Sequence, residues 1–225
     1  MTTQIQPLSV PSAIRARRSI RHYDSAPLPE DVLEELLSLT VEAPSSWNVQ
    51  ARSVVAVTGE AGRQGLSRAT GGQPHPTEAP VTLVFVADSR AWSGDLDDIW
   101  SRGQESGAWN AQFVAGFSQA SLEFHKDLEQ RGLLREYAVK DAMIAATYAM
   151  LSAASLGLAS SPMNGWDEAE VKKVLGIADR DELHIALLLP VGYPAETRLH
   201  PGRRPLPRHA FRDRHGYGYA RPASA

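Results

Sequence analysis

The sequence predicts a single α+β domain in which a few strands pack against long helices. Three runs of β-branched and aliphatic residues, SVVAVTG, VTLVFVAD and LHIALLLPVGYP, are typical of buried strands. Between the second and third runs, apolar residues recur at helical spacing over two long stretches. No repeat or low-complexity linker divides the chain, so we expect one domain over 1–225, with a core at about 13–206 and a loosely held tail at 207–225.

The first expected helix is PLPEDVLEELLSLTVEA, which is amphipathic. Pro29 suits its first position, and Glu30 with Asp31 complements the positive end of the helix dipole. PSSWN then ends the helix with turn residues. The two strands that follow, within 53–59 and 81–88, both look buried, and they are joined by a short helix and a Gly/Pro-rich loop.

The segment from 95 to 131 is predicted to be a largely helical excursion with one aromatic stripe. The stripe contains Trp109, Phe113, Phe117, Phe124 and Leu128. The stretch EYAVKDAMIAATYAMLSAASLGLAS predicts a second long helix that is apolar nearly all round, and such a helix is normally central.

Glycines and caps end the remaining elements. Gly157 suits the end of the second long helix. A small helix then begins at Asp167 as its cap, with Glu170 completing a capping box and Gly176 closing it. The run LHIALLLPVGYP is the strongest strand signal in the chain.

Composition excludes several classes of protein. The 225 residues hold 23 Lys+Arg, 26 Asp+Glu and no cysteine, which removes disulfides, thiolate metal sites and a cysteine nucleophile. A net charge of -3 gives no reason to expect nucleic-acid or membrane-surface binding. The first residues lack the pattern of a secretory signal, and no apolar run approaches the ~20 residues of a membrane span, so we expect a cytoplasmic protein.

Common catalytic motifs are also missing. There is no G-x-G-x-x-G after a strand and no P-loop, and the histidines show no metal-ligand spacing, so we expect no metal. GFSQA loosely imitates a nucleophile elbow, but Ser118 lies in a helical stretch where the elbow requires a preceding strand.

Arginines gather in two segments, RARRSIRHYD at 15–24 and PGRRPLPRHAFRDRHGYGYAR from 201 onward. In the first, five alternating residues would share one face of an extended chain: Arg15, Arg17, Ser19, Arg21 and Tyr23. Arginine and hydroxyl donors suit phosphate. Two interpretations stay open: two solvated basic surfaces, or two ends that meet around a single anion.

Five motifs in order resemble the nitroreductase family of FMN-dependent oxidoreductases. They read RRSIRHY, APSSWNVQ, LGLASSPMNGW, VGYP and GRRPL, and they extend from about Ala13 to Leu206. The resemblance implies a mostly antiparallel sheet sandwiched by helices and an intertwined homodimer with FMN at the subunit interface. It also implies ping-pong electron transfer from NADH or NADPH through FMN to nitroaromatics, quinones or similar flat acceptors.

The resemblance further implies roles for individual residues. Arg17, Arg18 and Ser19 would meet the FMN phosphate and ribityl chain, and Arg203 and Arg204 would join them at the phosphate. Arg21 would lie near the pyrimidine end of the flavin. The partner subunit would contribute Pro44, Ser45, Ser46 and Asn48, and the ring would be lined by Pro162, Met163, Asn164 and Gly165. No catalytic side chain is expected, because the flavin carries the chemistry and the Asn164 backbone N–H lies near N5.

Two regions leave alternatives. In the loop GGQPHP, Gln73 and His75 are the only stand-ins for the usual pyrimidine contacts, although a lone histidine in such a loop is more often exposed. Trp109 and Phe113 favour core or dimer packing, and in the family the same excursion covers the substrate pocket, where either ring could stack on a flat acceptor. Other flavin chemistry (ene reduction, dehalogenation, flavin reduction or destruction) and a non-catalytic phosphate or nucleic-acid binder are the alternative functions.

Overall fold

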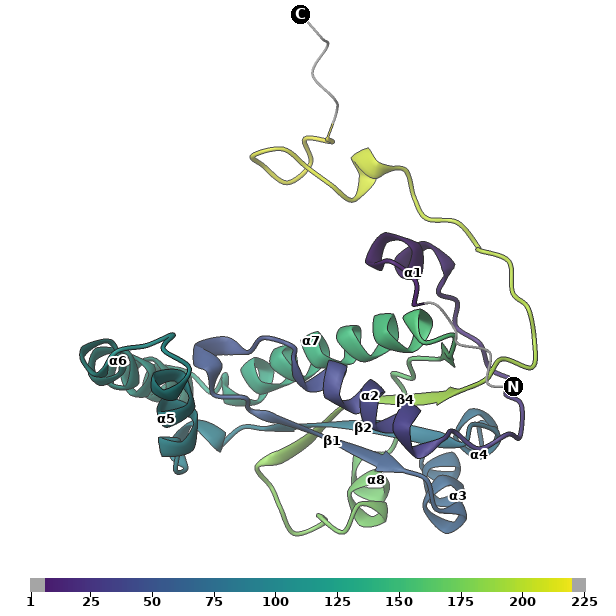
Figure 1. Cartoon of the computed structure of the whole chain (residues 1–225), viewed down its shortest axis with the longest axis horizontal. Coiled ribbons are helices and arrows are strands. Elements are labelled where there is room, and N and C mark those ends of the chain that lie inside the picture. Colours follow the sequence, from purple (N-terminus) through teal and green to yellow (C-terminus); the bar gives the residue numbers. More distant parts are fainter. Residues whose placement is uncertain (1–6, 220–225) are drawn as a thin grey trace, which may run out of the picture.

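The computed structural model describes residues 7–219 of the chain, so the last part of the predicted loose tail, 220–225, lies outside the described residues. Along this range, one, two or three helices precede each of the four strands (Figure 1). The helices are α1 Val10–Ala16, α2 Glu30–Val41, α3 Glu60–Ala69, α4 His75–Glu78, α5 Asp97–Glu105, α6 Ala111–Gln130, α7 Leu134–Ser155 and α8 Glu168–Val174. The strands are β1 Arg52–Val57, β2 Val81–Asp88, β3 Ala159–Ser160 and β4 Leu183–Gly192. Short 3-10 turns occupy Ser46–Asn48, Ala91–Ser93 and Leu206–Arg208.

The four strands form one sheet in the order β1-β2-β4-β3, and every neighbouring pair is antiparallel. β2 and β4 are the central pair, in register from Val81 opposite Val191 to Asp88 opposite Leu183. One irregularity in that pairing falls between Phe85 and Val86. The mostly antiparallel sheet expected from the sequence is therefore confirmed.

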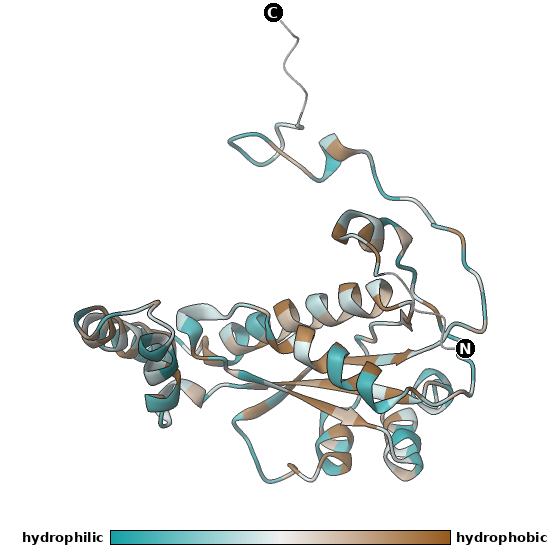
Figure 2. Ribbon diagram, in the orientation of Figure 1, coloured by the Kyte–Doolittle hydropathy of each residue, from teal (hydrophilic) through white to brown (hydrophobic). Residues whose placement is uncertain are grey.

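Helices cover both faces of the sheet, which confirms the expected sandwich. α2 and α7 pack on one face, while α3 and α8 lie on the other (Figure 1). Hydrophobic residues concentrate on the strands that these helices cover (Figure 2). The first core includes Leu36, Leu83 and Leu189, and the second includes Leu66 and Val171.

The second long helix is central, as its composition predicts. Its alanines at 142, 145, 146 and 149 are fully buried against the sheet and α2. Small side chains let the helix axis approach the strands closely, so the helix can be apolar nearly all round and still pack. Gly157 ends it with a φ of 75°, a conformation that glycine adopts without steric cost.

Three local predictions need correction. β1 is an edge strand with alternating burial, so the expectation that 53–59 is a buried strand is wrong. Pro29 is the residue before α2 and Glu30 is its first residue. Asp167 caps α8 through Glu170 N, but the capping box is incomplete, because the Glu170 carboxylate pairs with Lys173.

The segment after β4 leaves the sheet and extends past α1 (Figure 1). Residues 199–209 are exposed, although the sequence placed the domain core as far as 206. Farther on, Phe211 and Gly218 form an isolated bridge, so the described part of the predicted tail has local structure. In the single chain, the segment after β4 therefore projects from the domain as an arm (Figure 1).

Candidate functional site

A polar pocket forms where the chain leaves α1 and meets the segment after β4. It has a volume of about 310 Å³. Its lining is Arg17, Arg18, Ser19, Arg21, Arg198, Leu199, His200, Pro201 and Arg203, and we call these residues the arginine pocket. The two arginine segments therefore meet, as one of the two interpretations of the sequence proposed.

Two donors of the arginine pocket are buried and have no partner. They are Arg17 Nη1 and Arg18 Nε. Burial, and then the charges of Arg203 and Arg18, lower the pKa of Arg17. Because a buried donor without an acceptor is costly and like charges repel, this arrangement is suited to an anion that satisfies both.

Arg18 is partly committed to its own helix. Its Nη1 donates to the carbonyls of Arg15, Ala16 and Arg17 at 2.7, 3.1 and 2.8 Å, and so it caps the end of α1. The positive guanidinium also complements the negative end of the helix dipole. Of its polar atoms, Nε is the one left buried without a partner.

The expected common face of alternating residues at 15–23 is wrong at both ends. Arg15 belongs to α1 and is exposed, so it does not lie on the extended segment. Tyr23 is buried and its hydroxyl donates to Pro190 O at 3.1 Å, and burial raises its pKa. Arg17, Ser19 and Arg21 remain together in the pocket.

The last segment contributes more cations than the sequence analysis assigned. Arg203 lines the pocket, whereas Arg204 is exposed and is not part of the lining. Arg198 and His200 are lining residues that the analysis missed. Burial and the surrounding arginines lower the pKa of His200. The signal was present in the sequence, since ETRLHPGRR places these side chains directly before the quoted arginines.

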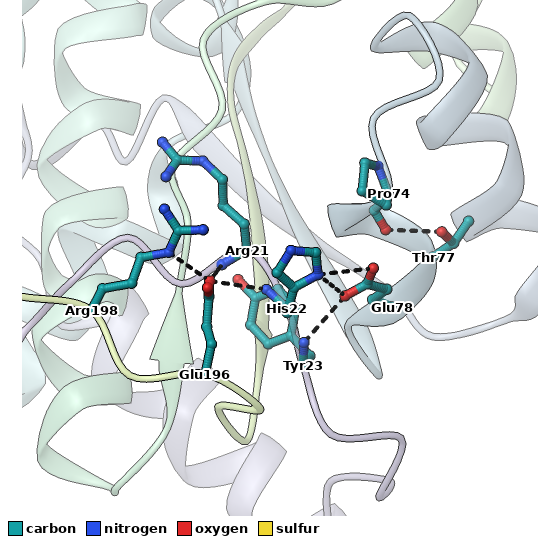
Figure 3. Close-up of polar contacts among 8 residues, drawn as sticks. All are labelled: Arg21, His22, Tyr23, Pro74, Thr77, Glu78, Glu196 and Arg198. Atoms are coloured by element: carbon teal, nitrogen blue, oxygen red, sulfur yellow. Dashed lines mark hydrogen bonds and ion pairs between the residues drawn. The ribbon is translucent and has the colours of Figure 1, made fainter.

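The loop 73–78 lies beside the arginine pocket (Figure 3). Glu78 accepts hydrogen bonds from the Tyr23 backbone N at 3.3 Å and lies 3.1 Å from His22 Nδ1. His75 is buried, against the usual behaviour of such a histidine, and its Nδ1 has no partner. Burial and the charge of Arg21 lower the pKa of His75. Gln73 is exposed and its Nε2 donates to Thr70 O.

The turn at 161–165 is held against β4. Met163 N donates to Leu188 O at 2.9 Å, and the Met163 side chain is buried in the second core. Asn164 and Gly165 are exposed and Pro162 is half-buried. The turn therefore offers a ligand its backbone and the side chains on either side of Met163.

The loop that contains Pro44, Ser45, Ser46 and Asn48 lies at the other end of the molecule, near α6 (Figure 1). Ser46 N donates to both carboxylate oxygens of Asp141 at 3.2 Å, and Ser46 Oγ donates to the Tyr137 hydroxyl at 3.1 Å. Trp47, Asn48 and Gln50 each have a φ of 54°, in the left-handed region that side chains disfavour. The surrounding contacts hold this strained loop in place.

Six aromatic rings pack together at that end, from α5, α6, the connection between these two helices and the loop before β1. This aromatic cluster consists of Trp47, Trp100, Trp109, Phe113, Phe117 and Phe124. Phe117 stacks on Phe113 with centroids 5.0 Å apart and lies 5.0 Å from Trp47. Trp109 packs against Gly103, where an added Cβ would lie 2.1 Å from the indole. Most of the predicted stripe is thus packing, and Phe113 is the ring that is largely exposed.

Other chemistries find no support among residues 7–219. Across that range no group of three or more His, Cys, Asp or Glu is arranged to hold a metal ion. Ser118 lies within α6 and its hydroxyl donates to Ala115 O, so no nucleophile elbow is formed. In the same described part of the chain, every helix is too short or too polar to cross a membrane.

Comparisons with known proteins identify the family. The model of the "Nitroreductase family" matches residues 14–193. A Thermus thermophilus protein named NADH dehydrogenase is 34% identical over 92% of this chain and 98% of its own length. The structure of the Bacillus subtilis protein ydfN superposes with a TM-score of 0.80 at 26% identity, covering 89% of this chain and 96% of that one. An Exiguobacterium sibiricum protein solved in complex with FMN has the same fold, with a TM-score of 0.78 at 20% identity over 88% of this chain and 94% of that one. The chain belongs to the nitroreductase family.

Proposed function

We propose that this protein is an FMN-dependent oxidoreductase that takes electrons from NADH or NADPH and passes them to a flat organic acceptor. The observation that carries the proposal is the arginine pocket, in which Arg17 and Arg18 hold buried donors with no partner. A phosphate monoester supplies a compact dianion with several acceptor oxygens, which suits such donors. The names of the relatives, one a dehydrogenase of NADH and one solved with FMN, support this choice.

The residues in and around the arginine pocket can be assigned to successive parts of FMN, from its phosphate to its ring. Arg17, Ser19 and Arg203 would bind the phosphate, and the Arg21 guanidinium would place positive charge toward the pyrimidine end. Bound FMN would supply the hydride chemistry, which explains why no acid or base side chain stands out. The backbone N–H of Asn164, an exposed residue, would donate to the ring. Buried His75, beside Arg21, would complete the pyrimidine end in its neutral form.

We propose that the active unit is a homodimer. The loop with Ser46 and Asn48 lies at the opposite end of the folded molecule from the arginine pocket, so a second copy is needed to bring both to one flavin (Figure 1). An apolar groove of about 450 Å³ between α1, α2 and α7 is lined by Leu8, Val10 and Tyr148 among others. Exposed apolar surface of this kind is suited to association. Sedimentation analysis should find a dimer, and a stable monomer that binds FMN would contradict this part.

The acceptor would be an aromatic or conjugated molecule such as a nitroaromatic or a quinone. Phe113 is largely exposed at the edge of the aromatic cluster, so its ring is free to stack on a flat ligand. Successive stacking of nicotinamide and acceptor on one flavin face implies ping-pong kinetics. The alternatives within the family are ene reduction, dehalogenation and flavin reduction, and a substrate screen distinguishes them.

The test is reconstitution with FMN. The purified protein should be yellow, should quench FMN fluorescence on titration, and should oxidise NADH or NADPH when a quinone or nitroaromatic is present. Initial rates at varied concentrations of both substrates should give parallel double-reciprocal lines. A colourless protein that leaves FMN fluorescence unchanged would contradict the proposal, and salt-sensitive nucleic-acid binding would then favour the non-catalytic alternative.

A further inference from the structure

The segment after β4 pairs briefly with the segment before α2. Residues 193–195 run antiparallel to 22–24, with a bridge between Tyr23 and Pro194. Backbone hydrogen bonds of 2.9 and 3.0 Å flank this bridge. The pairing lies at the edge of the arginine pocket, where the two ends of the chain meet.

Where that pairing ends, the Glu196 side chain, and not a backbone carbonyl, accepts hydrogen bonds from the N-terminal segment. Its Oε1 accepts from Arg21 N at 2.7 Å and from His22 N at 3.3 Å. The same oxygen lies 2.8 Å from Arg198 Nε. The bond to Arg198 and the bond from the Arg21 backbone lower the pKa of Glu196 to about 2, so the carboxylate is charged at neutral pH.

The two arginines that Glu196 holds are both lining residues of the arginine pocket. Figure 3 shows the Arg21 and Arg198 side chains extending to the same side of the Glu196 carboxylate. Glu196 fixes the first through its backbone and the second through its guanidinium. One carboxylate therefore links the N-terminal half of the pocket to the C-terminal half.

A carboxylate at this position has two opposite effects on an anion. Its charge repels phosphate, which would weaken binding. It also offsets the mutual repulsion of the pocket cations, which, after burial, contributes to the lowered pKa of Arg17 through the charges of Arg203 and Arg18. A pocket that is assembled before its ligand arrives spends less binding free energy on ordering. Because the carboxylate contacts two residues of the pocket, Arg21 and Arg198, and also the adjacent His22 backbone, we expect ordering to prevail.

We propose that Glu196 is a positioning residue for the phosphate of FMN, a role that rests on the proposed function. It holds the Arg21 backbone and the Arg198 guanidinium at the edge of the pocket, so its negative charge strengthens phosphate binding. The two effects differ in sign, which makes the proposal testable: removal of the charge would tighten binding by repulsion alone and would weaken binding if ordering prevails.

The experiment compares Glu196→Gln with Glu182→Gln. Glu182 forms the same kind of ion pair, with Arg180 two residues away, but it lies outside the arginine pocket and is a matched control. Fluorescence titrations with FMN and with riboflavin, which lacks the phosphate, are run on both variants and on the unmodified protein. Thermal unfolding is recorded for each.

Glu196→Gln should raise the Kd for FMN about tenfold, because it removes the charge that orients the Arg198 guanidinium toward the phosphate. The Kd for riboflavin should change by less than about threefold, because the amide oxygen of the new side chain can still accept from the Arg21 N–H, and the Arg21 side chain serves the pyrimidine end. Glu182→Gln should change neither. A purely structural role would weaken both ligands equally. An unchanged or lower Kd for FMN in Glu196→Gln, or an equal loss for riboflavin, overturns the proposal.

If Glu196→Gln does not fold, a second variant still tests the proposal. Arg198→Met keeps the Glu196 contacts to the backbone and removes only the oriented guanidinium, so it should raise the Kd for FMN about threefold or more. An unchanged Kd there contradicts the role of the pair. The proposed function is tested separately by the unmodified protein: if that protein does not bind FMN, the function fails, whereas binding that is equal in all variants removes only the role of Glu196.

Discussion

The segments that form the arginine pocket and the aromatic cluster lie at opposite ends of the folded molecule (Figure 1). The two regions differ in how completely their polar groups find hydrogen-bond partners. In the aromatic cluster each ring packs on others, and the neighbouring Ser46 backbone and hydroxyl both have partners. In the arginine pocket, like charges converge and buried donors of Arg17 and Arg18 have none.

This difference separates stability from binding. A region whose groups satisfy one another lowers the free energy of the folded chain by itself. A region with converging charges and unpaired donors is destabilising until a ligand provides the missing acceptors. Changes in the aromatic cluster should therefore alter unfolding, and changes in the arginine pocket should alter ligand affinity.

The largest effect is expected for Arg17→Met. Loss of a charged donor to the phosphate should raise the Kd for FMN about a hundredfold, since hydrogen bonds to charged groups contribute about 2–3 kcal/mol. The melting temperature should stay equal or rise, because a buried donor without a partner is removed. Fluorescence titration and calorimetry check both. The matched control is Arg15→Met, which changes an exposed arginine on α1. An equal loss of FMN affinity in that variant would contradict a specific role for Arg17 in binding the phosphate.

Phe117→Ala tests the other end. Phe117 contacts four aromatic rings of the cluster, so its loss should cost about 2 kcal/mol of unfolding free energy, below the value for a fully buried ring because Phe117 is half-buried. Denaturant unfolding measures this cost. The Kd for inorganic phosphate should be unchanged, and a change in that constant would show that the two ends are coupled.

A smaller effect is expected for Tyr137→Phe. The change removes the acceptor of the Ser46 hydroxyl and keeps the ring that packs on Phe124. One hydrogen bond of this kind contributes about 1 kcal/mol to unfolding free energy. Urea unfolding should resolve the loss, with Tyr217→Phe as the control, since that tyrosine is exposed and lies outside both the aromatic cluster and the proposed dimer groove. No loss in Tyr137→Phe would mean that Asp141 alone holds the loop.

The smallest effect is a contrast in pH dependence between two carboxylates. The bond to Arg198 lowers the pKa of Glu196 from 4.5 to about 2, so this group stabilises the fold above pH 4.5 and the contribution is lost as the pH falls toward 2. Burial raises the pKa of Asp141 above 3.8, so its ionised form opposes folding, and stability from this group is lost as the pH rises through the folded-state pKa.

Melting curves from pH 3 to 7 compare Glu196→Gln and Asp141→Asn with the unmodified protein. At pH 7 the first variant should melt lower and the second higher. Both differences should shrink as the pH falls. A lower melting temperature for Asp141→Asn at pH 7 would show that its bonds to Ser46 outweigh the cost of burial.

Much of the fold was predictable because its signals are local. The run VTLVFVAD is β2 from its first residue to its last, and it is buried on both faces because α2 and α7 cover one face of the sheet while α3 and α8 cover the other. The alanine-rich stretch is the central helix α7, and the order of the five motifs predicted the family that the comparisons confirm. For β2 and α7, the local residue pattern is predictive because buried residues recur along most of each element's length.

The errors arose where a distant segment supplied a partner. Glu170 does not close the capping box: the Asp167 N–H donates instead to Ala69 O on α3, and the Glu170 carboxylate pairs with Lys173. β1 looked buried by composition, yet it is the edge of the sheet, and strand order is not encoded in the strand itself. Tyr23 leaves the expected common face because Pro190 on β4 offers its carbonyl.

The sequence alone determined the α+β class and the presence of two arginine segments, because these depend on residue patterns within single elements. The family and its antiparallel sheet were implied by the resemblance of five motifs in order along the chain. Only the tertiary structure decided which arginines share a pocket, that Arg198 and His200 join them, and that Glu196 links the two ends. The physical reason is that charge and hydrogen-bond interactions act over a few ångströms in space, and residues 21 and 196 become neighbours only when β4 returns the chain to its start.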